Sequence, residues 1–134
     1  MFGLHWLIDH NVLAKDRLEE YYASYVASIF RTLRFGTGEA HGRAEMMEFN
    51  YLVENNALSL NAGVYNIDYA RMPSVLGRLA KELLEIEATG DRQRAENWFG
   101  KYTKMPADLT KVLAATKDIP VDIYPVFSFK DDVQ

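Results

Sequence analysis

The sequence predicts a mainly α protein, an irregular bundle of about five helices with one short β-hairpin. Apolar residues recur every three or four positions over long stretches, which is the spacing of an amphipathic helix. One short stretch alternates instead, as a strand does, and Gly, Asn and Asp separate the periodic stretches. With 134 residues, 49% of them hydrophobic and 25% charged, the chain is expected to form a single helical domain, residues 1–134.

The apolar spacing predicts a long helix from Leu18 to about Phe35. It should end there, because Gly36 and Gly38 are poor helix formers and are well suited to the left-handed conformations that close a helix. Its apolar stripe consists of Leu18, Tyr21, Tyr22, Tyr25, Val26, Ile29, Phe30 and Leu33.

A second helix is expected from about Glu39 to Asn55. Apolar residues spaced three or four positions apart predict one buried face, and bulky apolar residues beside them widen it. That face contains Ala40, Ala44, Met47 and Tyr51, with Phe49, Leu52 and Val53 beside them.

Residues 58–67 alternate between apolar and polar around Asn61-Ala62-Gly63, which predicts a hairpin. A two-stranded hairpin is only marginally stable in water, so it should lie against the helices.

Three further helices follow the hairpin in the sequence. Asp68 is expected to cap the first, which runs to about Ala88 with Pro73 near its start. Asp91 should cap the second, 92–102, and the third should run from Pro106 to about Thr116. The tail IPVDIYPVF reads as an extended arm, because its two prolines do not suit a central strand.

Composition excludes several classes of function. A formal net charge of -4 argues against a nucleic-acid partner, because phosphate binding needs a concentrated basic face. The absence of cysteine excludes disulfides and thiolate metal sites and fits a reducing compartment, so a cytoplasmic location is expected. No run approaches the roughly 18 apolar residues of a membrane span, so no membrane partner is expected.

The three histidines offer no metal site by their spacing. His5 and His10 point in different directions on a helix, and no HExxH pair is present. His5 and Asp9 share a helix face, but an ordinary surface or packing pair explains them better than a ligand pair. The glycines after residue 35 are not followed by the Lys-Ser/Thr of a phosphate loop. We therefore expect neither metal nor cofactor in this chain.

His41 is the candidate functional residue of the sequence. It lies in the first turn of its helix, beside Gly42 and between Ala40 and Ala44, so a partner or ligand could approach the backbone closely. Spacing alone favours a solvated or capping histidine over a functional one, and both readings stay open at this point.

The order of the segments resembles the C-terminal part of the dipeptidyl peptidase III family of zinc metallopeptidases, most closely its bacterial Zn-dependent hydrolase branch. The likeness runs from about Gly3 to Phe127. It is carried by GLHWLIDHNVL, EYYASYVASIFRTLRFG, EAHGRAEMMEFNYLVENNAL, YNIDYARM and LLEIEATGDRQRAENWFGKY.

This resemblance implies that zinc is bound elsewhere, by an HExxGH helix and a glutamate of a following helix, both upstream of the matching region. Met1 would then be an excised start, and the partners would be the upstream zinc-binding domain and, in the intact protein, a peptide-like substrate. The isolated chain would be inactive and prone to self-association. The alternative is a stand-alone, non-catalytic helical module that binds a protein partner.

The resemblance also implies a role for His41, which matches the family's Ala-His motif and would contact the substrate or its developing oxyanion. Better-known eukaryotic members carry an arginine four residues later on the same face, where this chain has Glu45. An anion at this substrate-binding position puts dipeptide-releasing specificity in doubt.

Overall fold

The computed structural model describes residues 1–120 and residue 126. In this part of the chain it is mainly helical, with one antiparallel hairpin, as the sequence predicts. The elements are α1 (Phe2–Asp9), a 3₁₀ helix η1 (Lys15–Arg17), α2 (Leu18–Leu33), α3 (Ala40–Glu54), β1 (Leu58–Asn61), β2 (Val64–Ile67), α4 (Met72–Thr89), α5 (Arg92–Tyr102) and α6 (Ala107–Ala115).

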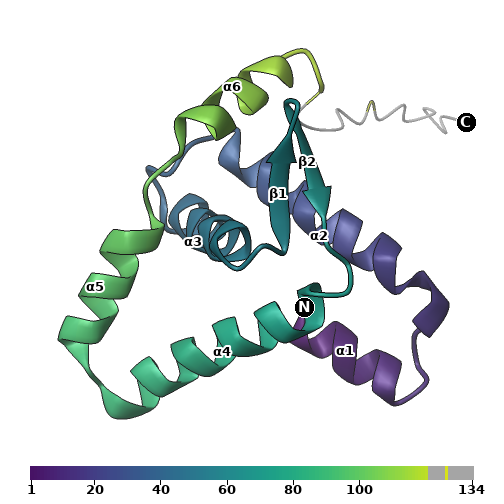
Figure 1. The fold of residues 1–134 in the computed structure, drawn as a ribbon, viewed down its shortest axis with the longest axis vertical. Coiled ribbons are helices and arrows are strands. Elements are labelled where there is room, and N and C mark those ends of the chain that lie inside the picture. Colours follow the sequence, from purple (N-terminus) through teal and green to yellow (C-terminus); the bar gives the residue numbers. More distant parts are fainter. Residues whose placement is uncertain (121–125, 127–134) are drawn as a thin grey trace, which may run out of the picture.

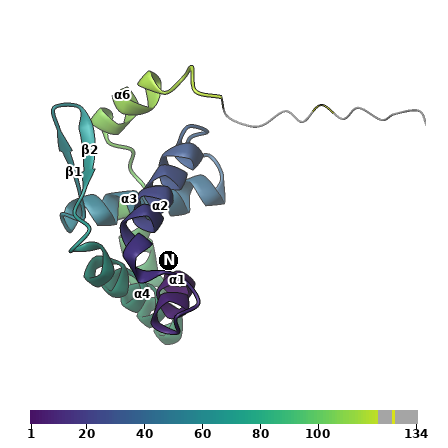
Figure 2. The ribbon, with the colours of Figure 1, turned by 90° about the vertical axis from the view of Figure 1, so that its right-hand side faces the viewer.

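Helix α3 is the centre of the arrangement, in contact with α2, α4, α5 and β1. Figure 1 shows α3 nearly end-on, with α4, α5 and α6 following one another around it. The hairpin stands beside α6 at one end of the molecule, and α1 lies beside α4 at the other (Figure 2). The hydrophobic core of the described residues is therefore built around α3.

The predicted stripe of α2 is confirmed by its burial. Tyr22, Val26, Ile29 and Leu33 are buried in the core, at the three- and four-residue steps that the sequence shows. The helix ends at Leu33, two residues earlier than expected. Gly36 follows with φ 82°, the left-handed conformation that suits glycine.

The buried face of α3 differs from the predicted one in the first half of the helix. Ala40 and Ala44 are exposed, whereas Gly42 and Met46 lie inside, followed by Phe49, Tyr51 and Leu52. Alanine carries too little apolar surface to orient a helix by itself, so the larger side chains of the second half decide which face is buried. The prediction was correct for Phe49, Tyr51 and Leu52.

Helix α4 begins later than predicted, at Met72, with Pro73 tolerated in its first turn. Asp68 does not cap it directly: its Oδ1 accepts a hydrogen bond from the Arg71 backbone N–H at 3.0 Å and so stabilises the turn before the helix. Asp91 does cap α5 as predicted, since its carboxylate accepts from the Arg94 N–H at 2.9 Å.

Tight backbone geometry closes the hairpin as the sequence predicts. Asn61 pairs with Val64, and the two residues between them, Ala62 and Gly63, both have positive φ, 50° and 80°. Such a two-residue turn matches the natural twist of the two strands. The Ala57 N–H donates to the Leu52 carbonyl at 2.9 Å and thereby ties the start of the hairpin to α3.

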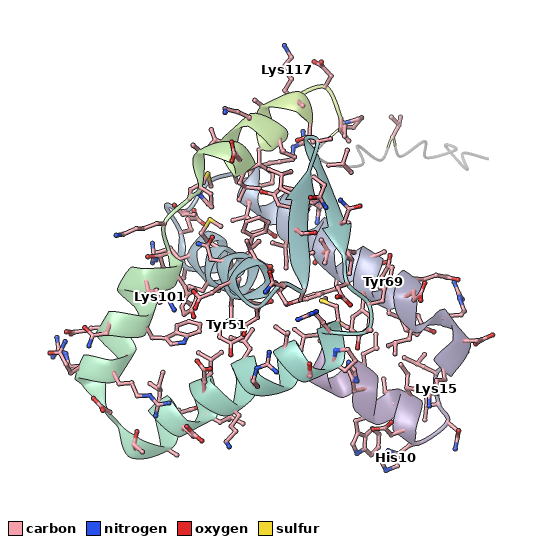
Figure 3. All side chains as sticks on the ribbon, viewed as in Figure 1. His10, Lys15, Tyr51, Tyr69, Lys101 and Lys117 are labelled. Atoms are coloured by element: carbon pink, nitrogen blue, oxygen red, sulfur yellow. The ribbon has the colours of Figure 1, made fainter. Side chains whose placement is uncertain are left out.

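Two further contacts attach the outer helices to the core. In α1, which was not among the predicted helices, His5 Nε2 lies 2.8 Å from the hydroxyl of the buried Tyr22. On the other side, the Glu82 carboxylate of α4 accepts from the Tyr51 hydroxyl at 2.7 Å and from the Trp98 indole N–H at 3.1 Å. Figure 3 shows Tyr51 directed into the space between α3, α4 and α5. Most of the predicted extended tail lies outside the described residues.

Candidate functional site

His41 lies in the first turn of α3, and its side chain is exposed. It borders a pocket of about 320 Å³ at the junction between the end of α2 and the start of α3. The N-terminal end of a 15-residue helix therefore faces this pocket beside the imidazole, and its free N–H groups carry partial positive charge. The lining consists of Thr32, Phe35, Gly36, Gly38, Glu39, His41 and Gly42.

Gly42, next to His41, leaves no room for a side chain, because the backbone of Gly36 packs against it. A Cβ placed on Gly42 would lie 2.1 Å from the carbonyl oxygen of Gly36, far inside van der Waals contact. The close approach expected at this position is thus made by the loop between α2 and α3, rather than by a ligand. Arg43 holds the same loop, donating from its guanidinium to the Gly38 carbonyl at 2.7 Å. Packing at Gly42 therefore fixes where His41 stands.

Phe35 is a part of this site that the sequence reasoning missed. Its side chain is 71% exposed and lines both the His41 pocket and a neighbouring pocket of about 440 Å³ beside α6. An exposed phenylalanine at the rim of a pocket is a ready contact for an apolar group. A signal was available: Phe35 is out of phase with the stripe that ends at Leu33.

Glu45 lies one turn beyond His41 but is not among the residues that line the pocket. Its Oε2 atom is buried and has no hydrogen-bond partner among the described residues. Burial and the nearby charge of Glu48 raise the pKa of Glu45, and the charge of His41 acts in the opposite direction. The two predicted site residues are thus close enough to interact electrostatically, although they occupy different surroundings.

A phenol–carboxylate pair continues the same side of α3. The Tyr25 hydroxyl of α2 donates to the Glu48 carboxylate, and the Tyr25 ring is partly buried. Burial first, and then the charges of Glu48 and Glu45, raise the pKa of Tyr25 well above its ordinary value. The sequence predicts Tyr25 only as a member of the apolar stripe of its helix, and it gives no sign of this pairing across 23 residues.

The other histidines have structural partners. His5 contacts Tyr22 rather than Asp9, and His10 Nδ1 lies 2.8 Å from the Trp6 carbonyl oxygen. Among residues 1–120, no three or more His, Asp or Glu side chains are grouped as a metal site would require. In the same range, every helix is too short or too polar to span a bilayer.

Comparison with known proteins identifies the fold. No family model matches the chain. The solved dipeptidyl-peptidase III of Corallococcus sp. strain EGB superposes on 92% of it, with a TM-score of 0.84 and 33% sequence identity. The DPP III of Caldithrix abyssi superposes on 94%, with a TM-score of 0.88 and 30% identity. A curated relative, Nudix hydrolase 3 of Arabidopsis thaliana, is 33% identical over 130 residues, which is 95% of the chain.

All these proteins are much longer than the present chain. It spans 17% of the Arabidopsis relative and 23% and 24% of the two solved structures. The relative also bears the name of a different kind of hydrolase from the two structures. What is common to the comparison structures is therefore the architecture of one segment, and the chain has the fold of that segment of dipeptidyl-peptidase III.

Proposed function

We propose that this chain is the C-terminal helical domain of a zinc-dependent hydrolase similar to dipeptidyl peptidase III, in which it forms one wall of the substrate cleft. The observation that carries the proposal is the superposition on two such enzymes over more than nine-tenths of the chain, at 30% and 33% identity. The position of His41 at the mouth of a pocket supports it. Peptide-like substrates are the corresponding substrate class.

His41 is assigned to contact with the substrate in the intact enzyme. Its ring is exposed rather than held by a neighbour in the described structure, so it is free to donate a hydrogen bond to oxygen charge that develops at a scissile carbonyl. The N-terminal end of α3 adds partial positive charge on the same side. The close packing of Gly42 on Gly36 holds the histidine in place relative to the pocket.

Glu45 is assigned to the electrostatics of the substrate site. As an anion one turn from His41, it would favour a cationic group of the substrate over an anionic one. An arginine here would do the opposite and would attract a carboxylate. Substrate preference in this protein should therefore differ from that of relatives with an arginine at this position.

Zinc would belong to the part of the protein that precedes this chain. When bound there, the metal would lower the pKa of a water ligand and polarise the carbonyl that is attacked. The residues of this chain would orient the peptide, exclude water from one side of it and stabilise negative charge through His41. The activity therefore needs both parts.

The second candidate function is a non-catalytic helical module that binds a protein partner. It is favoured by apolar side chains that stand in solvent, such as Trp6 at 57% and Phe35 at 71% exposure. Either function would give the chain a binding face, but only the first requires a zinc motif elsewhere in the same polypeptide.

The test is to read the gene upstream of the Met1 codon and to express both the extended protein and the 134-residue chain. The proposal expects an HExxGH helix and a glutamate-bearing helix upstream. The extended protein should bind one zinc and hydrolyse peptides, and the short chain should do neither. An upstream region without the motif, or a short chain that binds one zinc tightly, would favour the interaction module or another reaction.

A further inference from the structure

A mainly apolar groove runs along α4, on the side that faces α2, α3 and the start of the chain. Its volume is about 340 Å³. Among the described residues, only Tyr25 and Glu48 bring polar side-chain atoms into the lining, and none of them brings a cationic side chain. This α4 groove is lined by Met1, Tyr25, Glu48, Leu76, Leu79, Ala80, Leu83 and Leu84.

The floor and the wall of the α4 groove differ in burial. Leu76 and Leu79 are 5% exposed and belong to the core, whereas Leu83 is 40% and Leu84 is 63% exposed. Two adjacent leucines beside a hollow with apolar walls leave a continuous hydrophobic surface in water. Covering it would contribute about 25 cal/mol for each Å² buried. The surface is therefore suited to an apolar segment that lies along α4.

The polar end of the groove, at Tyr25 and Glu48, suits a charged group rather than an apolar one. The Glu48 carboxylate lines this end and accepts a hydrogen bond from the Tyr25 hydroxyl, whereas Glu45, one turn away along α3, does not line the groove. A basic side chain arriving from outside at this end would form a charge-assisted hydrogen bond with the Glu48 carboxylate.

The chain itself begins at this groove. Met1 lines it and is partly buried against the core, and its carbonyl accepts from the backbone N–H groups of Leu4 and His5 at 3.1 Å. In Figure 1 the N-terminal end lies against α4, and Figure 2 shows the same proximity from the side. A residue preceding Met1 would thus emerge beside the exposed leucines. The solved structures that share this fold are about four times longer than the chain.

We propose that the α4 groove holds the segment that precedes residue 1 in the longer protein. That segment is an amphipathic helix whose apolar face covers Leu83 and Leu84, with an Arg or Lys directed at Glu48. The inference rests on the proposed function, in which this chain is the C-terminal part of a larger polypeptide. It adds the surface by which the two parts are joined and the chemistry of the segment that occupies it.

The experiment uses the 134-residue chain and a synthetic peptide with the sequence of the 25 residues encoded immediately before Met1. Methyl NMR spectra of the leucines, recorded during titration with the peptide, report occupancy of the groove. The expected result is saturable shifts of the methyl signals of Leu76, Leu79, Leu83 and Leu84. Leu84→Glu should weaken binding at least tenfold, and Glu48→Gln should weaken it by a smaller factor.

Val64→Glu is the matched control, because Val64 is also 63% exposed but lies on β2, outside the groove lining. It should bind the peptide as the unmodified chain does. Equal weakening by Leu84→Glu and Val64→Glu would overturn the assignment to the groove. The melting temperature of each variant shows whether it folds, and Leu83→Glu provides a second probe of the same wall.

Other outcomes separate this inference from the proposed function. If the gene encodes an upstream HExxGH motif but millimolar peptide causes no methyl shifts, the groove inference is overturned and the zinc hydrolase proposal still holds. Peptide binding in the groove without that motif supports the inference and removes the zinc hydrolase. Sedimentation that shows a dimer abolished by Leu84→Glu, with no peptide binding, assigns the groove to a second copy of the chain and overturns the inference. A reading frame that stops just before Met1 overturns both.

Discussion

Gly42 and Gly36 are packed so closely that a single added methyl group would collide with the backbone. The Cβ of an alanine at position 42 would lie 2.1 Å from the Gly36 carbonyl oxygen and 3.2 Å from its carbonyl carbon. These two residues join the end of α2 to the start of α3, directly beside His41. The candidate site therefore depends on a glycine for packing rather than for flexibility.

Gly42→Ala should destabilise the protein by about 2 kcal/mol or more, because neither backbone can move without disturbing its helix. Urea unfolding followed by circular dichroism measures the change. Gly77→Ala is the control, since Gly77 lies inside α4 with no atom near its missing Cβ. That substitution should stabilise by roughly 0.5 to 1 kcal/mol. If both alanines have the same small effect, the close contact has no energetic importance.

Glu82→Gln should loosen the attachment of α5 to the core. The carboxylate accepts from both Tyr51 and Trp98, and an amide can present an oxygen to only one of them. A loss of about 1 to 2 kcal/mol is expected, together with a change in Trp98 fluorescence. Glu87→Gln, an exposed carboxylate on the same helix, should change neither.

The titration of Tyr51 gives an independent reading of the same contact. Burial and the hydrogen bond to Glu82 raise the pKa of Tyr51 to about 12. Between its ordinary pKa and that value, the folded state holds the phenol proton more tightly than the unfolded state does. Stability should therefore fall as the pH rises through this range. In Glu82→Gln the Tyr51 absorbance change near 295 nm should occur at lower pH; an unchanged titration would mean that Glu82 does not contribute to the shift.

Glu45→Gln tests the cost of the buried carboxylate. Its pKa is raised, so the folded state binds the proton more tightly, and stability is lost as the pH rises from the ordinary carboxyl pKa through the folded one. The glutamine variant escapes this loss. At pH 7 it should melt about 2 °C higher than the unmodified chain, and the difference should disappear near pH 4. A variant that melts lower at pH 7 would show that Glu45 has a favourable partner instead.

The parts of the fold that follow from local periodicity were predictable, and those that depend on distant contacts were not. The apolar stripe of α2 and the turn at Gly63 follow from residues that lie close together in the sequence. In contrast, α1 is attached through His5 and Tyr22, which are 17 residues apart. The burial of Gly42 depends on its contact with the backbone of Gly36, and the neighbouring residues in the sequence do not indicate that contact.

The candidate site was predictable to a smaller extent. The residue types around His41 indicate a helix start and no more, and its functional reading came from the order of the segments. Its exposure, and the pocket that it shares with Phe35, require the three-dimensional arrangement of α2 and α3. The same is true of Glu45, whose unpartnered oxygen results from burial that the sequence does not show.

The most direct test of the central claim is the turnover number of His41→Ala in the extended protein, measured together with zinc content and melting temperature. If His41 stabilises developing oxygen charge, kcat should fall by about 100-fold or more. Zinc content should stay the same, and stability should change by less than about 0.5 kcal/mol, because the side chain is exposed. His10→Ala, also exposed but located at the end of α1, should keep full activity. An unchanged kcat in His41→Ala with intact zinc would contradict the account and leave this domain as a scaffold.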